Sequence, residues 1–452
     1  MTGANEPHVG PVRDVAAGDG LLRRVLANAG MLLGGRTINA ILSLAYMALA
    51  ARALGVSEFG VLVLINAFAQ FIGEVAKFQS WQTVLHFGAA PFAEGRRADF
   101  QRVVRFSLIL DVASAVGGAA LGVLGAMLAG SLIGISSAMA PSAALYALTA
   151  AFMVPATPMG LLRLFNRFDV MSAQAAVGSL VRLVGGGVGF AIGAPISFFL
   201  IVWGAGTLAA FLYLTLASYW EIHRRGMAAG FSWKGPLTAG MPGAWRFAWA
   251  TNFSSSLDVA FTHVATLAVG SLLGSTEAAL WRVARQVADA LAKPAKLLAP
   301  ALYPELAKLR ATRGEGAMKK LALHVGLVGG GGATVLLLVT IVAGGPLLAL
   351  VMGPGFASAA STMTWQVAAA VIGVWALPLE PMLVSLGRPG AVVTVRLVVS
   401  ILFLAALAPV IAHFGLDGAG VALVVASVAM GLGMLVSLRR AMPGGPPPRP
   451  AH

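Results

Sequence analysis

The stretch LALHVGLVGGGGATVLLLVTIVA, residues 321–343, decides the fold class of this chain. It runs for 23 residues without an Asp, Glu, Lys or Arg. An α-helix needs about 20 such residues to cross the hydrocarbon core of a bilayer. Comparable apolar stretches recur along the chain, so the sequence predicts an all-α polytopic membrane protein.

The composition supports the same conclusion. Of the 452 residues, 58% are hydrophobic and only 11% are charged, whereas a soluble globular protein carries about 25% charged residues. A water-facing surface cannot be built from this composition, which excludes cytosolic enzymes and secreted modules. The chain has no cysteine, so disulfides, thiolate metal sites and thiol nucleophiles are excluded as well.

Apolar stretches bounded by charges or by Gly and Pro clusters predict about twelve transmembrane helices. The predicted spans are 25–50, 59–85, 106–129, 140–162, 171–192, 196–219, 247–273, 278–303, 321–343, 363–386, 391–412 and 418–438. They divide the chain into an amino-terminal lobe and a carboxy-terminal lobe of six spans each. The predicted segments are a disordered tail (1–24), the first lobe (25–220), a linker (221–246), the second lobe (247–440) and a Pro-rich tail (441–452).

The basic residues are distributed unevenly between the two sides of these spans. With the amino terminus in the cytoplasm, the inside segments hold 22 Lys and Arg, and the outside segments hold only Arg52. The positive-inside rule therefore predicts that both termini and the linker are cytoplasmic. This asymmetry also accounts for the net charge of +14 without a nucleic-acid partner.

Three pairs of motifs indicate an internal repeat. LGVSE (54–58) matches LGSTE (273–277) at an offset of 219, PATPM (155–159) matches PLEPM (378–382), and VRLV occurs at 181–184 and 395–398. The paired prolines predict a broken helix in the fourth and tenth spans. Because each lobe has an even number of spans, the repeats are parallel, and a cavity is expected between them.

Charged residues follow one face of the eighth span. Its polar positions keep helical spacing, and they are Arg282, Arg285, Asp289, Lys293 and Lys296. Asn66, Gln70, Glu74 and Lys77 repeat this pattern in the second span, and shorter stripes follow the first (Arg36, Asn39, Ser43, Tyr46) and seventh (Ser255, Asp258, Thr262) spans. A charge at the bilayer centre costs at least about 2.5 kcal/mol. We therefore expect the charged stripes to line a water-filled cavity or to pair across the bundle.

Eight bases and five acids lie inside the predicted spans, so pairing leaves a basic surplus that suits a phosphate or pyrophosphate headgroup. The candidate substrate-binding cations are Arg36, Lys77, Arg182, Arg282, Arg285, Lys293 and Lys296. The candidate groups for ion coupling are Glu74, Asp258, Asp289 and Glu380.

Structural roles remain open for several of these positions. The uncharged polar residues can instead join helices by hydrogen bonds, and Glu380 can mark a plain kink. Arg396 is expected to extend toward the nearer membrane surface, and Asp111 to be a helix-end residue. The seven histidines show no metal-ligand spacing, and no nucleotide-binding motif occurs. No metal or cofactor is therefore expected.

Four further motifs occur in order along the chain: LGVSEFG (54–60), GPGF (353–356), GRP (387–389) and FGLDGAG (414–420). With these motifs the chain resembles the polysaccharide-biosynthesis flippases of the multidrug/oligosaccharidyl-lipid/polysaccharide exporter (MATE/MOP) superfamily. These are the Wzx-like translocators of O-antigen and exopolysaccharide units. The match covers nearly the whole chain.

The resemblance implies two six-helix lobes and alternating access. It also implies export of an undecaprenyl-pyrophosphate-linked oligosaccharide across the bacterial inner membrane for lipopolysaccharide or exopolysaccharide synthesis, without enzyme activity. Membrane lipids and other polysaccharide assembly proteins are the implied partners. Twelve spans argue against the peptidoglycan-precursor flippases, which have two more.

Three alternatives stay open. A drug exporter of the same superfamily would favour an acidic or aromatic cavity for cationic drugs. A membrane glycosyltransferase or polymerase would need acid and base residues on an outside loop, and the longest such loop, 344–361, has no ionisable side chain. The third alternative is a scaffold that recruits assembly proteins without transporting anything.

Overall fold

The computed structural model describes residues 15–153, 155–296 and 299–442. Within these ranges it leaves out the side chains of 15–33, Arg36, 250, 253–262, 291–305 and 307–315. The regular structure of the described residues is entirely helical.

The helices of the first half are α1 (Val15–Ala76), α2 (Ser80–Ala93), α3 (Arg97–Ala129), η1 (Gly130–Ile133), η2 (Ser137–Met139), α4 (Ala140–Ala147), η3 (Leu148–Met153), α5 (Ala156–Leu164), α6 (Phe168–Ala191) and α7 (Ile196–Arg224). The second half contains α8 (Ala244–Leu273), α9 (Ser275–Lys296), α10 (Ala299–Met352), η4 (Pro354–Ala359), α11 (Ala360–Ala376), α12 (Leu379–Ser385) and α13 (Pro389–Ala441).

Each predicted span coincides with helical structure, and the prediction of a polytopic membrane fold is confirmed. Eight helical stretches of the described residues are long and apolar enough to cross a membrane. Pro389–Ala441 contains two predicted spans, and Thr37–Ala93 contains the span 59–85 and the second half of the span 25–50. The predicted spans 247–273 and 278–303 correspond to α8 and α9. Helix α9 is too polar to meet that criterion, but its first turns are buried among other helices.

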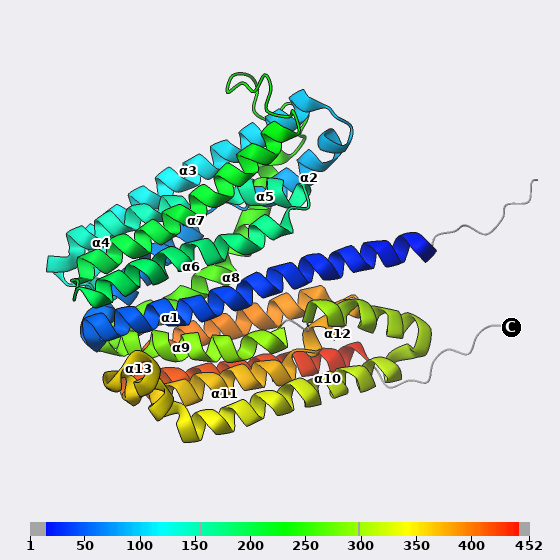
Figure 1. Cartoon of the computed structure of the whole chain (residues 1–452). Helices are drawn as coiled ribbons and strands as arrows, with labels where there is room; N and C mark the ends of the chain where they lie inside the picture. The colour runs from blue at the N-terminus through cyan, green and yellow to red at the C-terminus, as the bar shows by residue number, and fades with distance from the viewer. Residues whose placement is uncertain (1–14, 154, 297–298, 443–452) are drawn as a thin grey trace, which may run out of the picture.

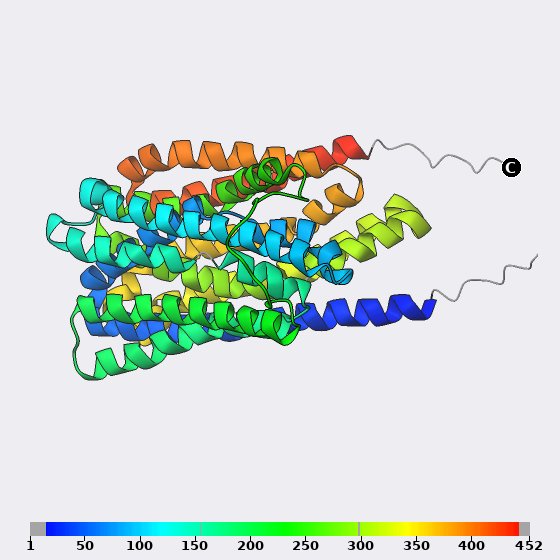
Figure 2. The same cartoon turned by 90° about the horizontal axis from the view of Figure 1, so that it is seen from above.

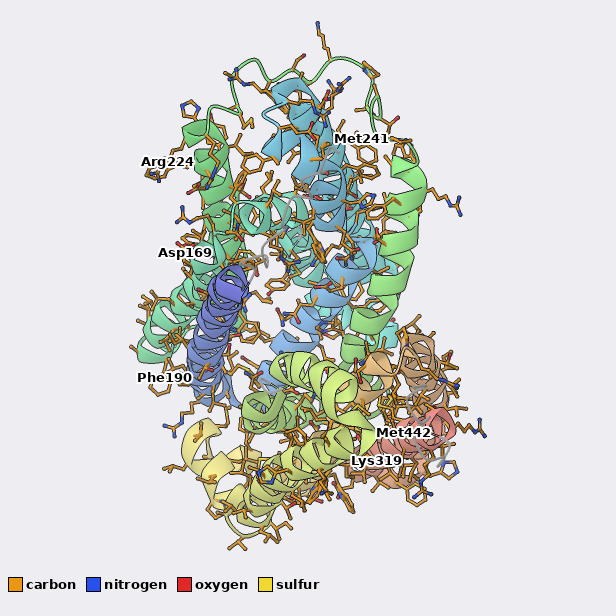
Figure 3. The ribbon with its side chains drawn as sticks, turned by 90° about the vertical axis from the view of Figure 1, so that its right-hand side faces the viewer. Asp169, Phe190, Arg224, Met241, Lys319 and Met442 are labelled. Atoms are coloured by element: carbon orange, nitrogen blue, oxygen red, sulfur yellow. The ribbon has the colours of Figure 1, made fainter. Side chains whose placement is uncertain are left out.

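The helices form two groups beside α1 (Figure 1). The first group comprises α2–α7 and the start of α8, and the second comprises α9–α13 and the end of α8. Both α1 and α13 have their chain ends on the same side of the bundle (Figures 1 and 2), which we call the terminal end. Figure 3 views this end, with Arg224 and Met241 on the first group and Lys319 and Met442 on the second. We call the other side the distal end.

Glycines in left-handed backbone conformations confirm the internal repeat. Gly55 (φ 71°) and Gly274 (φ 103°) both turn the chain back toward the terminal end, and they are 219 residues apart. Gly134 and Gly353 are separated by the same 219 residues and also have positive φ. Such angles are accessible to glycine without a steric penalty, so the LG motifs mark real turns.

The helix breaks follow the repeat as well. Helix η3 ends at Met153 and α5 begins at Ala156, whereas α11 ends at Ala376 and α12 begins at Leu379. The predicted breaks at the paired prolines are therefore confirmed.

Three details differ from the prediction. The span 59–85 is interrupted, because α1 ends at Ala76 and α2 begins at Ser80. The predicted tail 1–24 is helical from Val15 onward, since Leu and Arg at 21–24 favour a helix, and residues 1–14 and 443–452 lie outside the described part. The VRLV match does not join equivalent positions: Arg182 lies 16 residues after the left-handed Asn166, but Arg396 lies nine after the left-handed Gly387.

The hydrophobic cores differ between the two ends of the bundle. At the distal end one core contains residues of both halves, including Phe59 and Leu62 with Val283 and Phe356. At the terminal end the second group has its own core around Met318, Leu383 and Leu438. Separate clusters hold the first group there, and one of them includes the linker and the first turns of α8. The two groups are therefore joined at the distal end and are separately packed at the terminal end.

Candidate transport cavity

A large cavity of about 840 Å³ lies within the second half. It is enclosed by α8, α9, α11, α12 and both halves of α13. Five charged side chains line it: Arg282, Arg285, Asp289, Glu380 and Arg396. The volume falls in the range of about 300–1,000 Å³ that is typical of ligand sites.

Two ion pairs account for four of these charges. Arg285 lies 3.2 Å from Asp289 on α9, and Arg396 lies 3.0 Å from Glu380 across the break between α12 and α13. Arg282 makes no ion pair with any described residue. The described residues that line the large cavity therefore carry one positive charge in excess.

A smaller cavity of about 390 Å³ lies between α1, η3, α6 and α7, with His263 of α8 on its wall. Arg182 enters it from α6 and is held by neutral groups only. It donates hydrogen bonds to the Thr207 hydroxyl (2.8 Å), the Tyr46 hydroxyl (3.2 Å) and the Trp203 carbonyl (3.3 Å). Its guanidinium also lies over the rings of Tyr46 and Trp203, 5.5 and 5.7 Å from their centroids. No described carboxylate lies within ion-pair distance of Arg182.

Tyr46 interacts with one arginine from each cavity. It is buried on α1, where it accepts the hydrogen bond from Arg182 and is close enough to Arg282 for electrostatic interaction. Arg282 also interacts electrostatically with His263 and with Arg182 itself. Arginines from different halves of the chain thus both interact with one buried tyrosine.

The structure brings several sequence-predicted residues together. Arg282, Arg285, Asp289 and Glu380 share the large cavity, and Glu74 and Arg182 line the small one. Lys77, the first residue after α1, lies 3.8 Å from Glu74 in the last turn of that helix. The side chains of Arg36, Asp258, Lys293 and Lys296 lie outside the described residues.

Arg396 has a partner that the sequence did not indicate. Its side chain lines the large cavity and donates a hydrogen bond to Glu380. The cause is the proline-flanked break, which places the Glu380 carboxylate within reach of α13. Sequence reasoning also missed His263, Trp203 and Thr207; the only signal for His263 was its position next to the polar stripe of the seventh span.

Asp111 is not at the end of its own helix but buried in the middle of α3. It accepts hydrogen bonds from the Ser80 hydroxyl and from the N–H of Thr157 (2.7 Å). These residues open α2 and α5, so the carboxylate lies at two helix amino termini, where the helix dipoles favour a negative charge. Asp111 therefore stabilises both helix breaks of the first half.

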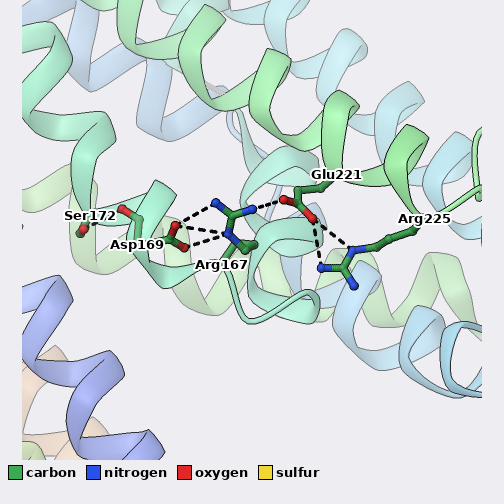
Figure 4. A network of polar contacts seen from close by, with 5 residues as sticks. All are labelled: Arg167, Asp169, Ser172, Glu221 and Arg225. Carbon is green, nitrogen blue, oxygen red and sulfur yellow. Dashed lines mark hydrogen bonds and ion pairs between the residues drawn. The ribbon is translucent and has the colours of Figure 1, made fainter.

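At the terminal end an ion-pair network fixes the first group (Figure 4). The side chain of Glu221, only 8% exposed, binds Arg167 and lies 3.0 Å from Arg225. Arg167 also lies 2.8 Å from Asp169 at the start of α6. The hydrogen bonds that Asp169 accepts, together with the charge of Glu221, raise the pKa of Arg167 further above its ordinary value. Arg167 therefore stays charged and ties α6 to α7.

The linker is attached to the same group. Arg105 of α3 is buried and donates hydrogen bonds to the carbonyls of Ser232, Lys234 and Pro236. Gln101, one turn earlier, donates to the carbonyls of Met227 and Ala229. The polar connection between the halves thus has a defined path along α3.

No family model matches this sequence. Among solved structures, the fold is similar to an inward-facing multidrug resistance MATE family transporter of the MOP superfamily, with a TM-score of 0.73, 14% identity and coverage of 89% of this chain and 94% of that chain. It is also similar to the lipid II flippase MurJ in an inward closed conformation, with a TM-score of 0.65, 14% identity and coverage of 90% and 87%. Both likenesses show a MATE/MOP transporter fold.

A curated relative is similar in sequence as well. The inner membrane protein YghQ of Escherichia coli (strain K12) is 30% identical over 348 residues, which cover 74% of this chain and 94% of the relative. The chain is therefore a multi-pass membrane protein with a MATE/MOP transporter fold, and it belongs to the family of the inner membrane protein YghQ.

Proposed function

We propose that this protein is a flippase that moves a lipid-linked oligosaccharide, carried on undecaprenyl pyrophosphate, across the bacterial inner membrane. The product would serve lipopolysaccharide O-antigen or exopolysaccharide synthesis. Pyrophosphate and sugars cannot enter hydrocarbon unaided, so the protein has to supply a polar path for them. The proposal involves no covalent chemistry.

One observation carries this proposal: Arg182 and Arg282 both interact with Tyr46, the first through a hydrogen bond and the second electrostatically, and neither forms an ion pair with a described residue. Keeping an unpaired cation inside a membrane protein is costly, so retention of two together points to an anion that joins them during function. Guanidinium groups bind phosphate oxygens through two parallel hydrogen bonds. Arg36, Lys77, Arg285, Lys293 and Lys296 remain candidate contacts along the path.

The charge arrangement favours this function over export of cationic drugs. Both acids that line the large cavity, Asp289 and Glu380, are paired with arginines. A cationic drug would have to displace an arginine from one of them. Glu74, Asp258, Asp289 and Glu380 remain candidates for ion coupling, which requires a partner exchange between conformations.

We further propose that the terminal end faces the cytoplasm and that the structure is an inward-facing state. The basic bias of the sequence supports this orientation. The distal end is joined by a core common to both halves, whereas the groups are separately packed at the terminal end. Rocking of one group against the other would expose the arginines alternately to the two sides.

The test is translocation of undecaprenyl-pyrophosphate-linked oligosaccharide by protein in liposomes. Arg182→Gln and Arg282→Gln should each lower the rate by about tenfold to a hundredfold, since a charge-assisted hydrogen bond contributes about 1.5–3 kcal/mol. Arg97→Gln, which removes an exposed charge at the start of α3, is the control and should retain the wild-type rate. The proposal would be refuted if both cavity variants kept the wild-type rate. It would also be refuted if the protein exported a cationic dye and the two substitutions increased that export.

A further inference from the structure

Besides the two cavities, an apolar hollow lies on the second half of the chain. It is a groove of about 810 Å³ between α11 and the two halves of α13. Leu402, Phe414, Val421 and Val425 line it and are among the exposed large hydrophobic residues of the chain. Asp417 is the only ionisable residue on its wall, and it accepts hydrogen bonds from Ser361 (2.9 Å) and Thr362 (3.3 Å).

The groove adjoins the large cavity. Val399, Phe403 and Ala426 line both hollows. Val399 lies ten residues into α13 from Pro389, or about 15 Å along the helix axis. That distance is about half of a hydrocarbon core of roughly 30 Å, so the shared wall lies near the middle of the membrane.

The chemistry changes abruptly across this wall. Ser400 and Ser427 directly follow two of the shared residues, and they line the cavity but not the groove. Arg396, one turn before Ser400, also faces the cavity only. One side of the α13 hairpin therefore presents hydroxyl and guanidinium groups, and the other presents hydrocarbon.

We propose that the groove holds the hydrocarbon chain of the transported lipid while its anionic headgroup occupies the large cavity. Val399, Phe403 and Ala426 then form the passage through which the two parts of the molecule stay connected. This inference rests on the proposed function and adds to it where the lipid chain binds. Only an amphiphile with an anionic head and a long chain matches both hollows, because the chain gains nothing in a polar cavity and the pyrophosphate cannot enter the groove.

Another helix is the alternative occupant of such a surface. The groove floor contains small residues, Ala406, Gly418, Ala422 and Ala429, and small residues also form helix–helix contacts in membranes. The groove is continuous with a cationic cavity, which favours a lipid as the occupant. A docked helix would not require a cationic cavity beside the groove.

The experiment compares two neighbouring alanines of α13. Ala406 lines the groove, whereas Ala405 is exposed outside it. We expect Ala406→Trp to fill the groove and Ala405→Trp to leave it open. Each variant, reconstituted in nanodiscs, is titrated with undecaprenyl pyrophosphate and, separately, with inorganic pyrophosphate.

Ala406→Trp should weaken the binding of undecaprenyl pyrophosphate by about tenfold, the size of a 1.4 kcal/mol loss, and leave the binding of inorganic pyrophosphate unchanged. Ala405→Trp should change neither. Ala429→Trp, on the opposite half of α13, should give the same result as Ala406→Trp. Agreement of the two variants would show that the loss of binding does not come from a folding defect of one of them. A diazirine on the prenyl chain should label the peptide 399–414.

The outcomes separate this inference from the proposed function. The groove holds only bulk lipid, and the inference is wrong, if inorganic pyrophosphate binds but the prenyl chain adds no affinity in the wild type. The same conclusion follows if the two groove variants, Ala406→Trp and Ala429→Trp, bind undecaprenyl pyrophosphate normally. If neither probe binds the wild type, the proposed function fails and the inference fails with it. A change from dimer to monomer in Ala406→Trp, with normal lipid binding, would assign the groove to a second copy.

Discussion

The distal and terminal ends of the bundle are held by different kinds of contact. At the distal end, α1 meets the second half through backbone and apolar groups: Gly60 lies so close to Ser275 that an added Cβ would be 1.9 Å from the Ser275 carbonyl oxygen, and the rings of Phe59 and Phe356 are 5.8 Å apart. Arg52 adds hydrogen bonds to carbonyls at the end of α10. At the terminal end, the ion pairs of Glu221 join helices of the same group.

The difference indicates at which end the two helix groups can separate. Apolar contacts without ion pairs can separate and re-form without leaving a buried charge unpaired. The ion-pair network around Arg167 instead makes the first group a rigid unit at the end where the groups are already separate. We therefore expect conformational change to exchange the distal contacts and to leave the terminal networks intact.

The sharpest test of the comparison is the sidedness of the two ends, because its result is all or none. The chain has no cysteine, so single cysteines can be introduced at exposed positions of each end. In spheroplasts, a membrane-impermeant maleimide should label Ser137→Cys at the distal end and not Lys234→Cys at the terminal end. The reverse pattern would place the terminal end outside and would contradict the proposed direction of transport.

A large effect is expected when the distal contact is disturbed. Gly60→Ala places a methyl group against the Ser275 backbone, and overpacking of this kind costs about 1–3 kcal/mol. The conformation with a closed distal end should become less populated by roughly tenfold or more. Leu64 is fully buried in this conformation, so a cysteine at this position should be labelled more from the distal side. Transport should fall.

Gly187→Ala is the matched control for this variant. Gly187 lies on α6 with no heavy atom within 4 Å of an added Cβ, and alanine is the better helix former by about 1 kcal/mol. The control should therefore be as stable as the wild type or more so. If Gly60→Ala transports at the wild-type rate with Leu64→Cys still protected, the distal contact is not the part that moves.

At the terminal end the expected effect is on the stability of the protein. Glu221→Gln removes the charge that Arg167 and Arg225 share, and should destabilise the protein by about 1–3 kcal/mol, seen as a lower melting temperature in detergent. Asp169→Asn should cost less, because the Asp169 side chain is 51% exposed and exposed pairs contribute about 0–1 kcal/mol. A larger loss for Asp169→Asn than for Glu221→Gln would show that the network is not centred on Glu221.

Much of the fold could be predicted because membrane spans and special backbone angles leave local signals. The apolar stretches predict the helices, the LG motifs predict the turns at Gly55 and Gly274, and the paired prolines predict the breaks before α5 and α12. The break before α2 was missed because no proline marks it. It depends on the Ser114 hydroxyl, which accepts the hydrogen bond of the Phe78 N–H from a different helix.

The candidate site could be predicted only in part. Helical spacing and the cost of a buried charge were enough to single out Arg182, Arg282 and Arg285. Spacing within one helix cannot show which charges meet across helices, so the pairing of Arg396 with Glu380 and the interaction of both Arg182 and Arg282 with Tyr46 were not predictable. The repeated VRLV motif gave a wrong equivalence for the same reason, because Arg182 and Arg396 lie at different distances from the turns that precede their helices.

The left-handed residues also record how the two copies of an ancestral half have changed in length. From Gly55 to Gly134 and from Gly274 to Gly353 the count is 79 in each copy, so no net insertion survives there. The next interval, which ends at Asn166 in the first copy and at Gly387 in the second, is two residues longer in the second copy. The interval after it, which ends at Gly193 and Gly415, is one residue longer in the second copy. The two copies thus agree in length between their first two positive-φ glycines and differ after them, and the same type of backbone conformation is adopted by an asparagine at 166 and by a glycine at 387.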